Sequence, residues 1–342
     1  MTEIETYLAE HAREIEAAAG RIAPFVRRTP SLTTDLDGRL VLKPECFQVT
    51  GSFKARGAFN AMLKLKDERP DTNGVIAVSS GNHAQALALA AKAVGIPAVI
   101  LIPNDANPAK VAATRAHGAE VIQEGVTFDN REQRMREVRD ERGLTLVHPF
   151  DNWDIIHGAG TAARELLQEH PDLEAIVTPV GGGGLFCGTA LAAKAHNPRL
   201  KVIGVEPEAA DDARRTVEAK AIQTLASSPT TIADGVRTVS IGERNFEVMV
   251  LKGLIDEIVT VGEQEIQESL LTAWTRLKLA LEPTGVLPLA AYEHGKIKTP
   301  SGSGKVGLIL SGGNANLQLV SRLLREAVEA RQSTQEATAQ QH

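Results

Sequence analysis

The chain has 342 residues, of which 43% are hydrophobic and 23% charged, and its 37 basic and 43 acidic residues give a net charge of −6. This length corresponds to one large domain or two ordinary ones, and it can bury a core without disulfide staples. The acidic balance argues against a dedicated nucleic-acid-binding protein, the acidic first residues lack the apolar core of a signal peptide, and glycines interrupt the longest uncharged apolar stretch, which argues against a membrane span.

Taken in chain order, the sequence starts with an amphipathic run rich in Ala and Glu, residues 4–22, which predicts a helix that packs on the core or on another subunit. Short β-branched runs then alternate with longer amphipathic runs. The expected strands are residues 75–80, 98–103, 120–124, 145–148, 175–180, 202–206, 257–261 and 306–311. The expected helices are residues 84–94, 108–117, 131–142, 161–169, 185–196, 263–281 and 317–330. This alternation predicts an α/β fold with mostly parallel sheets, in which ligands bind beyond the carboxyl ends of the strands.

The segment TGSFKARG, residues 50–57, is the first motif that could carry chemistry. Lys54 lies in a turn of small residues that opens a helix, and a helix N-terminus favours the neutral form of an amine. A neutral amine is a nucleophile and can form a Schiff base. Taken alone, the segment is explained more simply as a solvated lysine at a helix start.

The segment VSSGNHA, residues 78–84, follows an expected strand directly and precedes an expected helix. Its backbone N–H groups could hold a carboxylate at the start of that helix. A capped strand-to-helix turn is an equally good explanation, because Ser and Asn are favoured N-caps.

The segment PVGGGGL, residues 179–185, places four consecutive glycines between an expected strand and an expected helix. Glycines cost backbone entropy, and their use here is close approach of the backbone to an anion, most often a phosphate. No Gly-Lys-Ser/Thr follows, and Leu185 or Cys187 stands where the dinucleotide fingerprint requires a glycine. The loop therefore predicts a phosphate without indicating a nucleotide.

Two further segments carry weaker signals. LSGGN, residues 310–314, places the hydroxyl of Ser311 after a strand, where it can donate or accept one hydrogen bond. EPEAADD, residues 206–212, offers the oxygen atoms that hard cations prefer. A glycine-containing turn and a solvated acidic turn explain these segments more simply when each is taken alone. Cys46 and Cys187 are too few for a disulfide framework or a zinc site of cysteine pairs, which predicts a reducing cytoplasm.

One ligand would use three of these motifs together. Pyridoxal phosphate offers an aldehyde to Lys54, a phosphate to the glycine loop and a ring nitrogen to a hydroxyl such as Ser311. With four motifs in this order, the sequence resembles the fold type II pyridoxal-phosphate enzymes, specifically the serine/threonine dehydratase and serine racemase branch, over roughly residues 20–325. The resemblance implies a two-domain α/β fold like that of the tryptophan synthase β-subunit. It implies a large cofactor-binding domain of residues 1–64 and 149–330 and a small mobile domain of residues 65–148, and we expect a disordered tail of residues 331–342.

The resemblance also implies a role for each motif residue. Lys54 would hold the cofactor as a Schiff base and act as the base on one face of the substrate Cα, with Ser80 on the opposite face. The other cofactor-binding residues would be Phe53 against the ring, Asn82 at the 3′ oxygen, Gly181, Gly182, Gly183 and Gly184 at the phosphate, and Ser311 at the ring nitrogen. The substrate carboxylate would be held by Ser79, Ser80, Gly81, Asn82 and His83. A divalent cation, Mg²⁺ or Ca²⁺, would be held by Glu206, the Ala210 carbonyl and Asp212, and Glu282 lies where the family places an acidic residue near the ring.

The function that the resemblance implies is a lyase of the dehydratase type, which converts a β-hydroxy-L-amino acid to a 2-oxo acid and ammonia. L-Threonine or L-serine is the default substrate. A neutral hydroxyl at the ring nitrogen supplies no charge to the ring, which favours rapid loss of the β-hydroxyl. We expect a cytoplasmic homodimer with a small-molecule substrate and with neither nucleic acid nor membrane as a partner.

The substrate-side segment HPFDNWDIIHGAGT, residues 148–161, departs from the family pattern. Phe150 stands where serine racemases have a polar residue, Ala159 replaces a common glutamine, and His157 replaces a usual small residue. These departures weaken a pure racemase interpretation and leave room for a larger substrate such as phenylserine or 3-hydroxyaspartate, although Phe150 and Trp153 could equally belong to the core. The alternatives that stay open are a serine racemase with Ser80 as its second base, a β-replacement synthase and a non-enzymatic phosphate-binding module.

Overall fold

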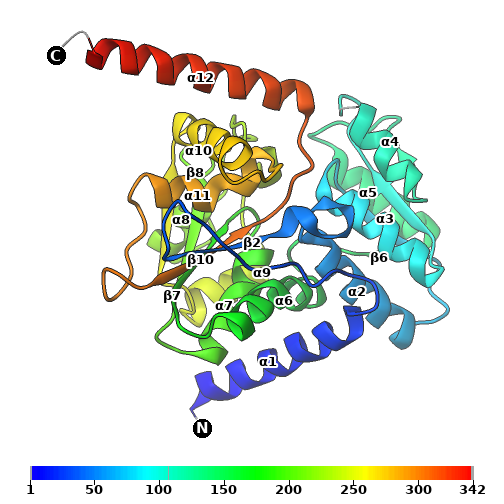
Figure 1. Cartoon of the computed structure of the whole chain (residues 1–342). Helices are drawn as coiled ribbons and strands as arrows, with labels where there is room; N and C mark the ends of the chain where they lie inside the picture. The colour runs from blue at the N-terminus through cyan, green and yellow to red at the C-terminus, as the bar shows by residue number, and fades with distance from the viewer. Residues whose placement is uncertain (1, 107, 340–342) are drawn as a thin grey trace.

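The computed structural model describes residues 2–106 and 108–339, and it contains two sheets of different size, flanked by helices (Figure 1). The six-stranded sheet has the order β1-β2-β10-β7-β8-β9 and is parallel except for β1, which pairs antiparallel with β2. The four-stranded sheet has the order β5-β4-β3-β6 and is parallel throughout. The predicted α/β fold with mostly parallel sheets is therefore confirmed.

The strands are β1 Leu32–Thr33, β2 Leu40–Pro44, β3 Val75–Val78, β4 Ala98–Leu101, β5 Glu120–Ile122, β6 Thr145–Leu146, β7 Leu173–Pro179, β8 Lys201–Pro207, β9 Glu257–Val261 and β10 Lys305–Leu310. The helices are α1 Glu3–Ile22, α2 Lys54–Glu68, α3 Asn82–Val94, α4 Pro108–Ala116, α5 Arg131–Arg142, α6 Trp153–Glu169, α7 Gly184–His196, α8 Asp212–Ala219, α9 Glu243–Phe246, α10 Glu263–Thr275, α11 Leu287–Glu293 and α12 Leu317–Ala339.

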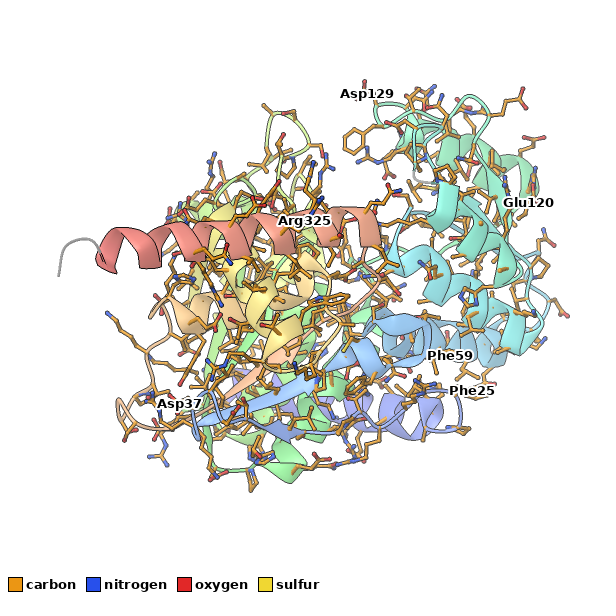
Figure 2. The ribbon with its side chains drawn as sticks, turned by 45° about the horizontal axis from the view of Figure 1, so that its top comes forward. Phe25, Asp37, Phe59, Glu120, Asp129 and Arg325 are labelled. Atoms are coloured by element: carbon orange, nitrogen blue, oxygen red, sulfur yellow. The ribbon has the colours of Figure 1, made fainter. Side chains whose placement is uncertain are left out.

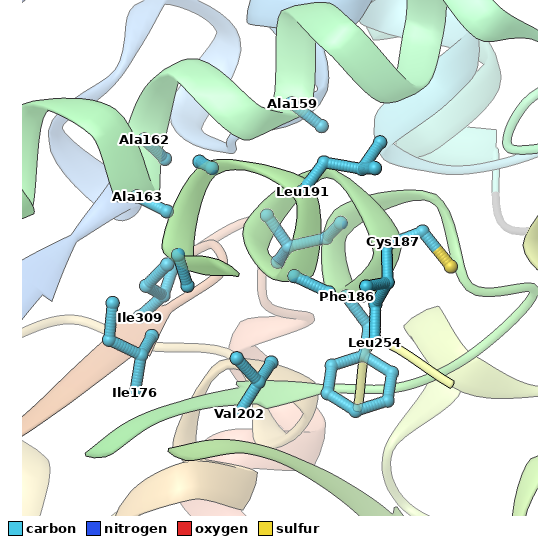
Figure 3. Close-up of a cluster of buried hydrophobic side chains, with 14 of the residues drawn as sticks. Ala159, Ala162, Ala163, Ile176, Phe186, Cys187, Leu191, Val202, Leu254 and Ile309 are labelled. Carbon is cyan, nitrogen blue, oxygen red and sulfur yellow. The ribbon is translucent and has the colours of Figure 1, made fainter. Parts of the chain in front are cut away.

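Helices cover both faces of the larger sheet. On one side α6 and α7 pack on the strands and α1 lies across both helices, whereas α10 and α11 cover the other face with α12 outside α10 (Figure 1). Figure 3 shows the core under α6 and α7, which contains Ala159, Ala162, Ala163, Ile176, Phe186, Leu191, Val202 and Ile309. All of these side chains are buried, so removal of their apolar surface from water stabilises this layer.

Helix α6 begins at Trp153, earlier than the expected helix of residues 161–169. Asn152 caps it, because its side chain accepts hydrogen bonds from the backbone N–H groups of Asp154 and Ile155. Inside the helix, a Cβ added to Gly158 would lie 2.6 Å from the Cα of Gly57 in α2. Close packing between helices therefore outweighs the low helix propensity of glycine. Because the sequence prediction rested on propensity, it missed the first half of this helix.

The C-terminal elements also differ from expectation. Helix α10 ends at Thr275, before the expected residue 281, and Lys278 beyond it has a left-handed φ of 59°. Helix α12 continues to Ala339, into the segment that we expected to be disordered, and residues 340–342 lie outside the described part of the chain. Glu, Gln, Arg and Ala are good helix formers, which explains the extension. In the described residues no helix is long and apolar enough to cross a membrane.

Helix α2 lies between the two sheets, in contact with α3 of the smaller sheet and α6 of the larger one. Near its middle the ring of Phe59 stacks on Phe25 from the segment after α1, with centroids 5.4 Å apart (Figure 2). Because Lys54 is the first residue of α2, this arrangement carries it to the junction of the sheets. The prediction that Lys54 opens a helix is confirmed.

A buried group of four charged side chains fixes α2 to its neighbours. Arg56 of α2 pairs with Glu45 after β2 and with Glu165 of α6, each at 2.7 Å, and Lys43 of β2 pairs with Glu165 at 2.7 Å. Arg56 and Lys43 are 0% exposed, so each charge depends on its partners in place of water. Two residues before Arg56, Lys54 is thereby held in a defined position.

Candidate active site

The four sequence motifs meet around one cavity of about 660 Å³ at the junction of the two sheets. Its lining includes the residues expected at the cofactor and substrate, namely Phe53, Lys54, Ser79, Ser80, Gly81, Asn82, His83, Gly181, Gly182, Gly183, Gly184 and Ser311. The structure therefore brings these residues together, and their individual roles remain predictions. The acidic residues 206–212 are absent from this lining.

Lys54 is held by contacts between segments that are far apart in the sequence. The backbone N–H of Phe53 donates to the carbonyl of Ser311 at 3.0 Å, which connects the start of α2 to the end of β10. Lys54 Nζ donates to the carbonyl of Pro149 at 2.8 Å. Burial lowers the pKa of Lys54 to about 8, so its amine is neutral far more often than that of a solvated lysine.

The glycine loop connects the end of β7 to the start of α7. Gly183 is in the left-handed region with φ of 102°, and a Cβ added to Gly182 would lie 2.3 Å from the ring of Phe150. The N–H groups of Gly182, Gly183 and Gly184 form no hydrogen bond with the described residues. Asn245 Nδ2 donates to the Gly182 carbonyl at 2.9 Å and helps to fix the loop. The loop therefore presents free donors at a helix N-terminus, where an anion binds well.

The loop of residues 79–83 occupies the corresponding place in the smaller sheet. The backbone N–H of Ser79 donates to the Leu101 carbonyl at 3.2 Å, and α3 begins three residues later at Asn82. His83 is 2% exposed, and its Nε2 lies 3.1 Å from the Val147 carbonyl, which assigns the proton to Nε2. Burial lowers the pKa of His83 to about 3. Its ring is thus a neutral group, fixed against the residue that follows β6.

Asn82 is held at both ends of its amide by residues whose contacts the sequence did not indicate. Its Nδ2 donates to Glu282 Oε1 at 2.7 Å, and its Oδ1 accepts from Asn314 Nδ2 at 2.8 Å. Burial raises the pKa of Glu282 to about 7. One N–H of Asn82 stays available. Asn314 belongs to the LSGGN motif, and this was the only sequence signal that could have identified it.

The two aromatic residues of the substrate-side segment have different positions. Phe150 lines the cavity, between the glycine loop and His148, whose ring it meets edge-on at 4.6 Å between centroids. Trp153 is outside that lining, and its ring stacks at 5.7 Å from His157 and lies 4.5 Å from His11 of α1. Phe150 can therefore shape the cavity, whereas Trp153 packs α1 against α6.

An ion pair crosses the mouth of the cavity. Lys110 Nζ of α4 lies 2.5 Å from Asp234 Oδ2, which belongs to the short 3₁₀ helix Asp234–Val236. Both residues line the cavity, and they belong to segments beside different sheets. This contact lies between residues 124 positions apart and had no sequence signal.

A sequence profile of the family described as pyridoxal-phosphate dependent enzyme matches residues 21–312. The chain belongs to this family. It is 42% identical over 317 residues to serine racemase of Oryza sativa subsp. indica, covering 90% of this chain and 92% of that protein. It is 42% identical over 312 residues to L-threo-3-hydroxyaspartate ammonia-lyase of Saccharomyces cerevisiae, covering 90% and 94%. The solved structure of T.th. threonine deaminase is similar with a TM-score of 0.82 and 47% identity, covering 89% of this chain and 98% of that one.

The cavity of this pyridoxal-phosphate-dependent enzyme has the features that the cofactor requires. The unpaired N–H groups of the glycine loop suit a phosphate, and any side chain on Gly182 would fill the space beside Phe150. Lys54 supplies an amine of lowered pKa, and Ser311, which is 3% exposed, also belongs to the cavity lining. The residues present therefore fit pyridoxal phosphate.

The acidic segment of this pyridoxal-phosphate-dependent enzyme lies at the end of β8. Glu206 accepts from the N–H groups of Ala213 and Arg214, each at 2.9 Å, and both carboxylate oxygens of Asp212 are buried without a hydrogen-bond partner among the described residues. Burial raises the pKa of Asp212 to about 7. In the described part of the chain, no three His, Cys, Asp or Glu side chains are grouped as metal ligands. A divalent cation at this site would therefore be held by the carboxylates of Glu206 and Asp212 and by the Ala210 carbonyl.

Proposed function

We propose that this chain is an ammonia-lyase of the dehydratase type, which converts a β-hydroxy-L-amino acid to a 2-oxo acid and ammonia by β-elimination, with L-threonine or L-serine as the default substrate. One observation carries the proposal: a lysine of lowered pKa, a glycine loop with free donors and a second donor loop line the same cavity. The names of the yeast and T.th. proteins, an ammonia-lyase and a threonine deaminase, support it.

In this proposal loops of the larger sheet and the start of α2 provide most of the cofactor site, and Asn82 beside the smaller sheet completes it. The N–H groups of Gly181, Gly182, Gly183 and Gly184 hold its phosphate, Phe53 packs on its ring, Asn82 donates to its 3′ oxygen and Ser311 meets its ring nitrogen. Bound pyridoxal phosphate supplies an electron-withdrawing ring that makes the Cα proton of the substrate acidic. The fixed amide of Asn82 supports this assignment, because only one of its N–H groups is free.

The substrate lies between Lys54 and the loop of the smaller sheet. The Lys54 amine, neutral in a substantial fraction of molecules near pH 8, accepts the proton from Cα. Ser79, Ser80, Gly81, Asn82 and His83 hold the carboxylate through their hydroxyls and the backbone N–H groups that remain free, with Ser80 on the face opposite Lys54. The Ser79 N–H is bonded to the Leu101 carbonyl, so Ser79 contributes its hydroxyl. Residues 65–148 form the small domain that closes over the substrate, and residues 1–64 and 149–330 form the large domain. The Lys110–Asp234 pair at the mouth supports such a closure.

We propose further that Glu206, the Ala210 carbonyl and Asp212 hold a divalent cation, Mg²⁺ or Ca²⁺. The two unpartnered oxygens of Asp212 support this site, because a buried carboxylate is costly without a partner. A homodimer in the cytoplasm completes the proposal, and the free thiols of Cys46 and Cys187 agree with a reducing compartment. Sedimentation velocity of the purified chain tests the dimer, since a monomeric mass would refute it.

Racemisation of serine is the second candidate function. Ser80 lines the cavity together with Lys54, and the similar rice protein is named serine racemase. A racemase needs an acid–base group on each face of Cα, and Ser80 is the residue that would supply the second. Appearance of D-serine from L-serine distinguishes this activity from elimination.

The test is 2-oxo acid release by the purified protein with pyridoxal phosphate and magnesium. The compounds are L-serine, L-threonine, L-threo-3-hydroxyaspartate and L-threo-phenylserine, and D-serine is measured in the first reaction. We expect turnover of at least one compound, a loss of about 10³-fold or more in Lys54→Ala, and a lower rate after EDTA treatment that magnesium restores. Release of 2-oxo acid from none of the four would refute the dehydratase proposal, and D-serine alone would establish the racemase.

A further inference from the structure

His148 occupies a part of the cavity wall to which the proposed function, on which this inference rests, gives no role. The cofactor and the substrate carboxylate take up the glycine loop, Ser311 and the loop of residues 79–83. His148 precedes Pro149, whose carbonyl binds Lys54 Nζ at 2.8 Å, and it lines the same cavity as Lys54. The substituent on the substrate Cβ therefore has to point to a part of the cavity wall that neither the cofactor nor the substrate carboxylate occupies.

The hydrogen bonds of His148 determine where its proton lies. The backbone N–H of Asp151 donates to His148 Nδ1 at 2.9 Å, so Nδ1 is an acceptor and the neutral ring carries its proton on Nε2. Nε2 forms no hydrogen bond with the described residues. The side chain therefore presents an unused N–H donor on a ring that lines the cavity.

The ring is held in place from several directions. Phe150 packs edge-on against it with centroids 4.6 Å apart, and the preceding residue, Val147, has its carbonyl bound by His83. Burial lowers the pKa of His148, and the positive charge of Lys54 acts in the same direction. Protonation of Nδ1 would also destroy its bond to Asp151. A rigid neutral imidazole with a single donor is the result.

We propose that His148 is a specificity-determining residue, whose Nε2–H donates a hydrogen bond to the oxygen substituent on Cβ of the substrate. A hydroxyl or carboxylate oxygen satisfies this donor, whereas a side chain without an acceptor leaves it unpaired beside the reacting centre. The imidazole keeps its proton throughout, so the role is one of binding and orientation and involves no proton transfer.

The test compares L-serine with β-chloro-L-alanine, which has the same carbon skeleton but a leaving group that is a poor hydrogen-bond acceptor. His148→Asn keeps an oxygen that can accept from the Asp151 N–H and removes the donor at the Nε2 position. His148→Gln places an amide N–H near that position. We expect His148→Asn to lower kcat/KM for L-serine about tenfold and that for β-chloro-L-alanine about twofold or less, and His148→Gln to restore L-serine to within about threefold of wild type.

The outcomes separate this proposal from the function on which it rests. An equal loss with both compounds in His148→Asn, no loss with L-serine, or no recovery in His148→Gln would overturn the role of His148 while the wild-type activity stands. Wild-type protein that releases 2-oxo acid from neither compound would overturn the proposed function, and the role of His148 with it. Thermal unfolding and the absorbance of bound pyridoxal phosphate, measured for each variant, identify a loss that comes from misfolding.

Discussion

The two sides of the cavity are built differently. The side that would bind the cofactor consists of loops at the ends of β7 and β10 and the start of α2, joined by backbone hydrogen bonds such as Phe53 N–H to the Ser311 carbonyl. The side that would bind the substrate combines a loop of the smaller sheet with the chain from Val147 to Asn152, and side chains make its cross-connections, as in the Lys110–Asp234 pair. Backbone hydrogen bonds persist whichever side chains are present, whereas side-chain contacts change with the residue, so we expect the first side to be rigid and the second to set specificity.

Of the substitutions that test this difference between the two sides of the cavity, we expect the largest effect from Gly182→Ala. A Cβ there would lie 2.3 Å from the Phe150 ring, so Gly182→Ala has to displace the ring or the loop at a cost of about 3 kcal/mol, which is over a hundredfold in affinity for pyridoxal phosphate. A Cβ on Gly81, in the loop of the smaller sheet, meets nothing within 4 Å, so Gly81→Ala should leave that affinity within about threefold. Equilibrium titration of the apo-protein measures both, and the double variant Gly182→Ala, Phe150→Ala should regain affinity. Equal affinities for the two single variants would contradict the comparison.

A smaller effect is expected from the protonation of Lys54, where the two sides meet. Only the neutral amine reacts with an aldehyde, and burial lowers the pKa of Lys54 from its usual 10.5 to about 8. The rate at which the apo-protein combines with pyridoxal phosphate should therefore rise about fiftyfold from pH 6 to pH 8 and then level off. Stopped-flow absorbance measures this rate, with Lys54→Ala as a control that forms no covalent adduct. A rate that keeps rising tenfold per pH unit to pH 10 would mean an unshifted lysine.

The smallest effect is expected at the mouth of the cavity. The Lys110–Asp234 pair is partly exposed, and such pairs contribute little, so Lys110→Ala should raise KM about two- to fivefold with kcat nearly unchanged. The exchanged pair Lys110→Asp, Asp234→Lys should bring KM back toward wild type, and each single charge reversal should be worse than Lys110→Ala. Steady-state kinetics at low and high salt measure these differences, which salt should reduce. A change in kcat with no change in KM would show that the ion pair does not contribute to substrate binding.

Local sequence signals could predict most of the cofactor side. Four glycines after a strand and a lysine in a small-residue turn indicate their chemistry within a few residues, and the order of the motifs identified the family. The same signals failed for Glu282 and Asn314 as the partners of Asn82, because those contacts join residues 200 and 232 positions apart. They also hid the first half of α6, where Gly158 is used for contact between helices rather than for a turn.

The four buried charges under α2 have a consequence for protein engineering. Lys43, Glu45, Arg56 and Glu165 share their hydrogen bonds, so a change at any one position leaves a partner charged, buried and unsatisfied. In directed evolution we expect single substitutions at these four positions to destabilise the protein. Only variants in which several of the four residues are replaced together should stay folded. Libraries that are meant to reshape the cavity should leave all four untouched or randomise them together.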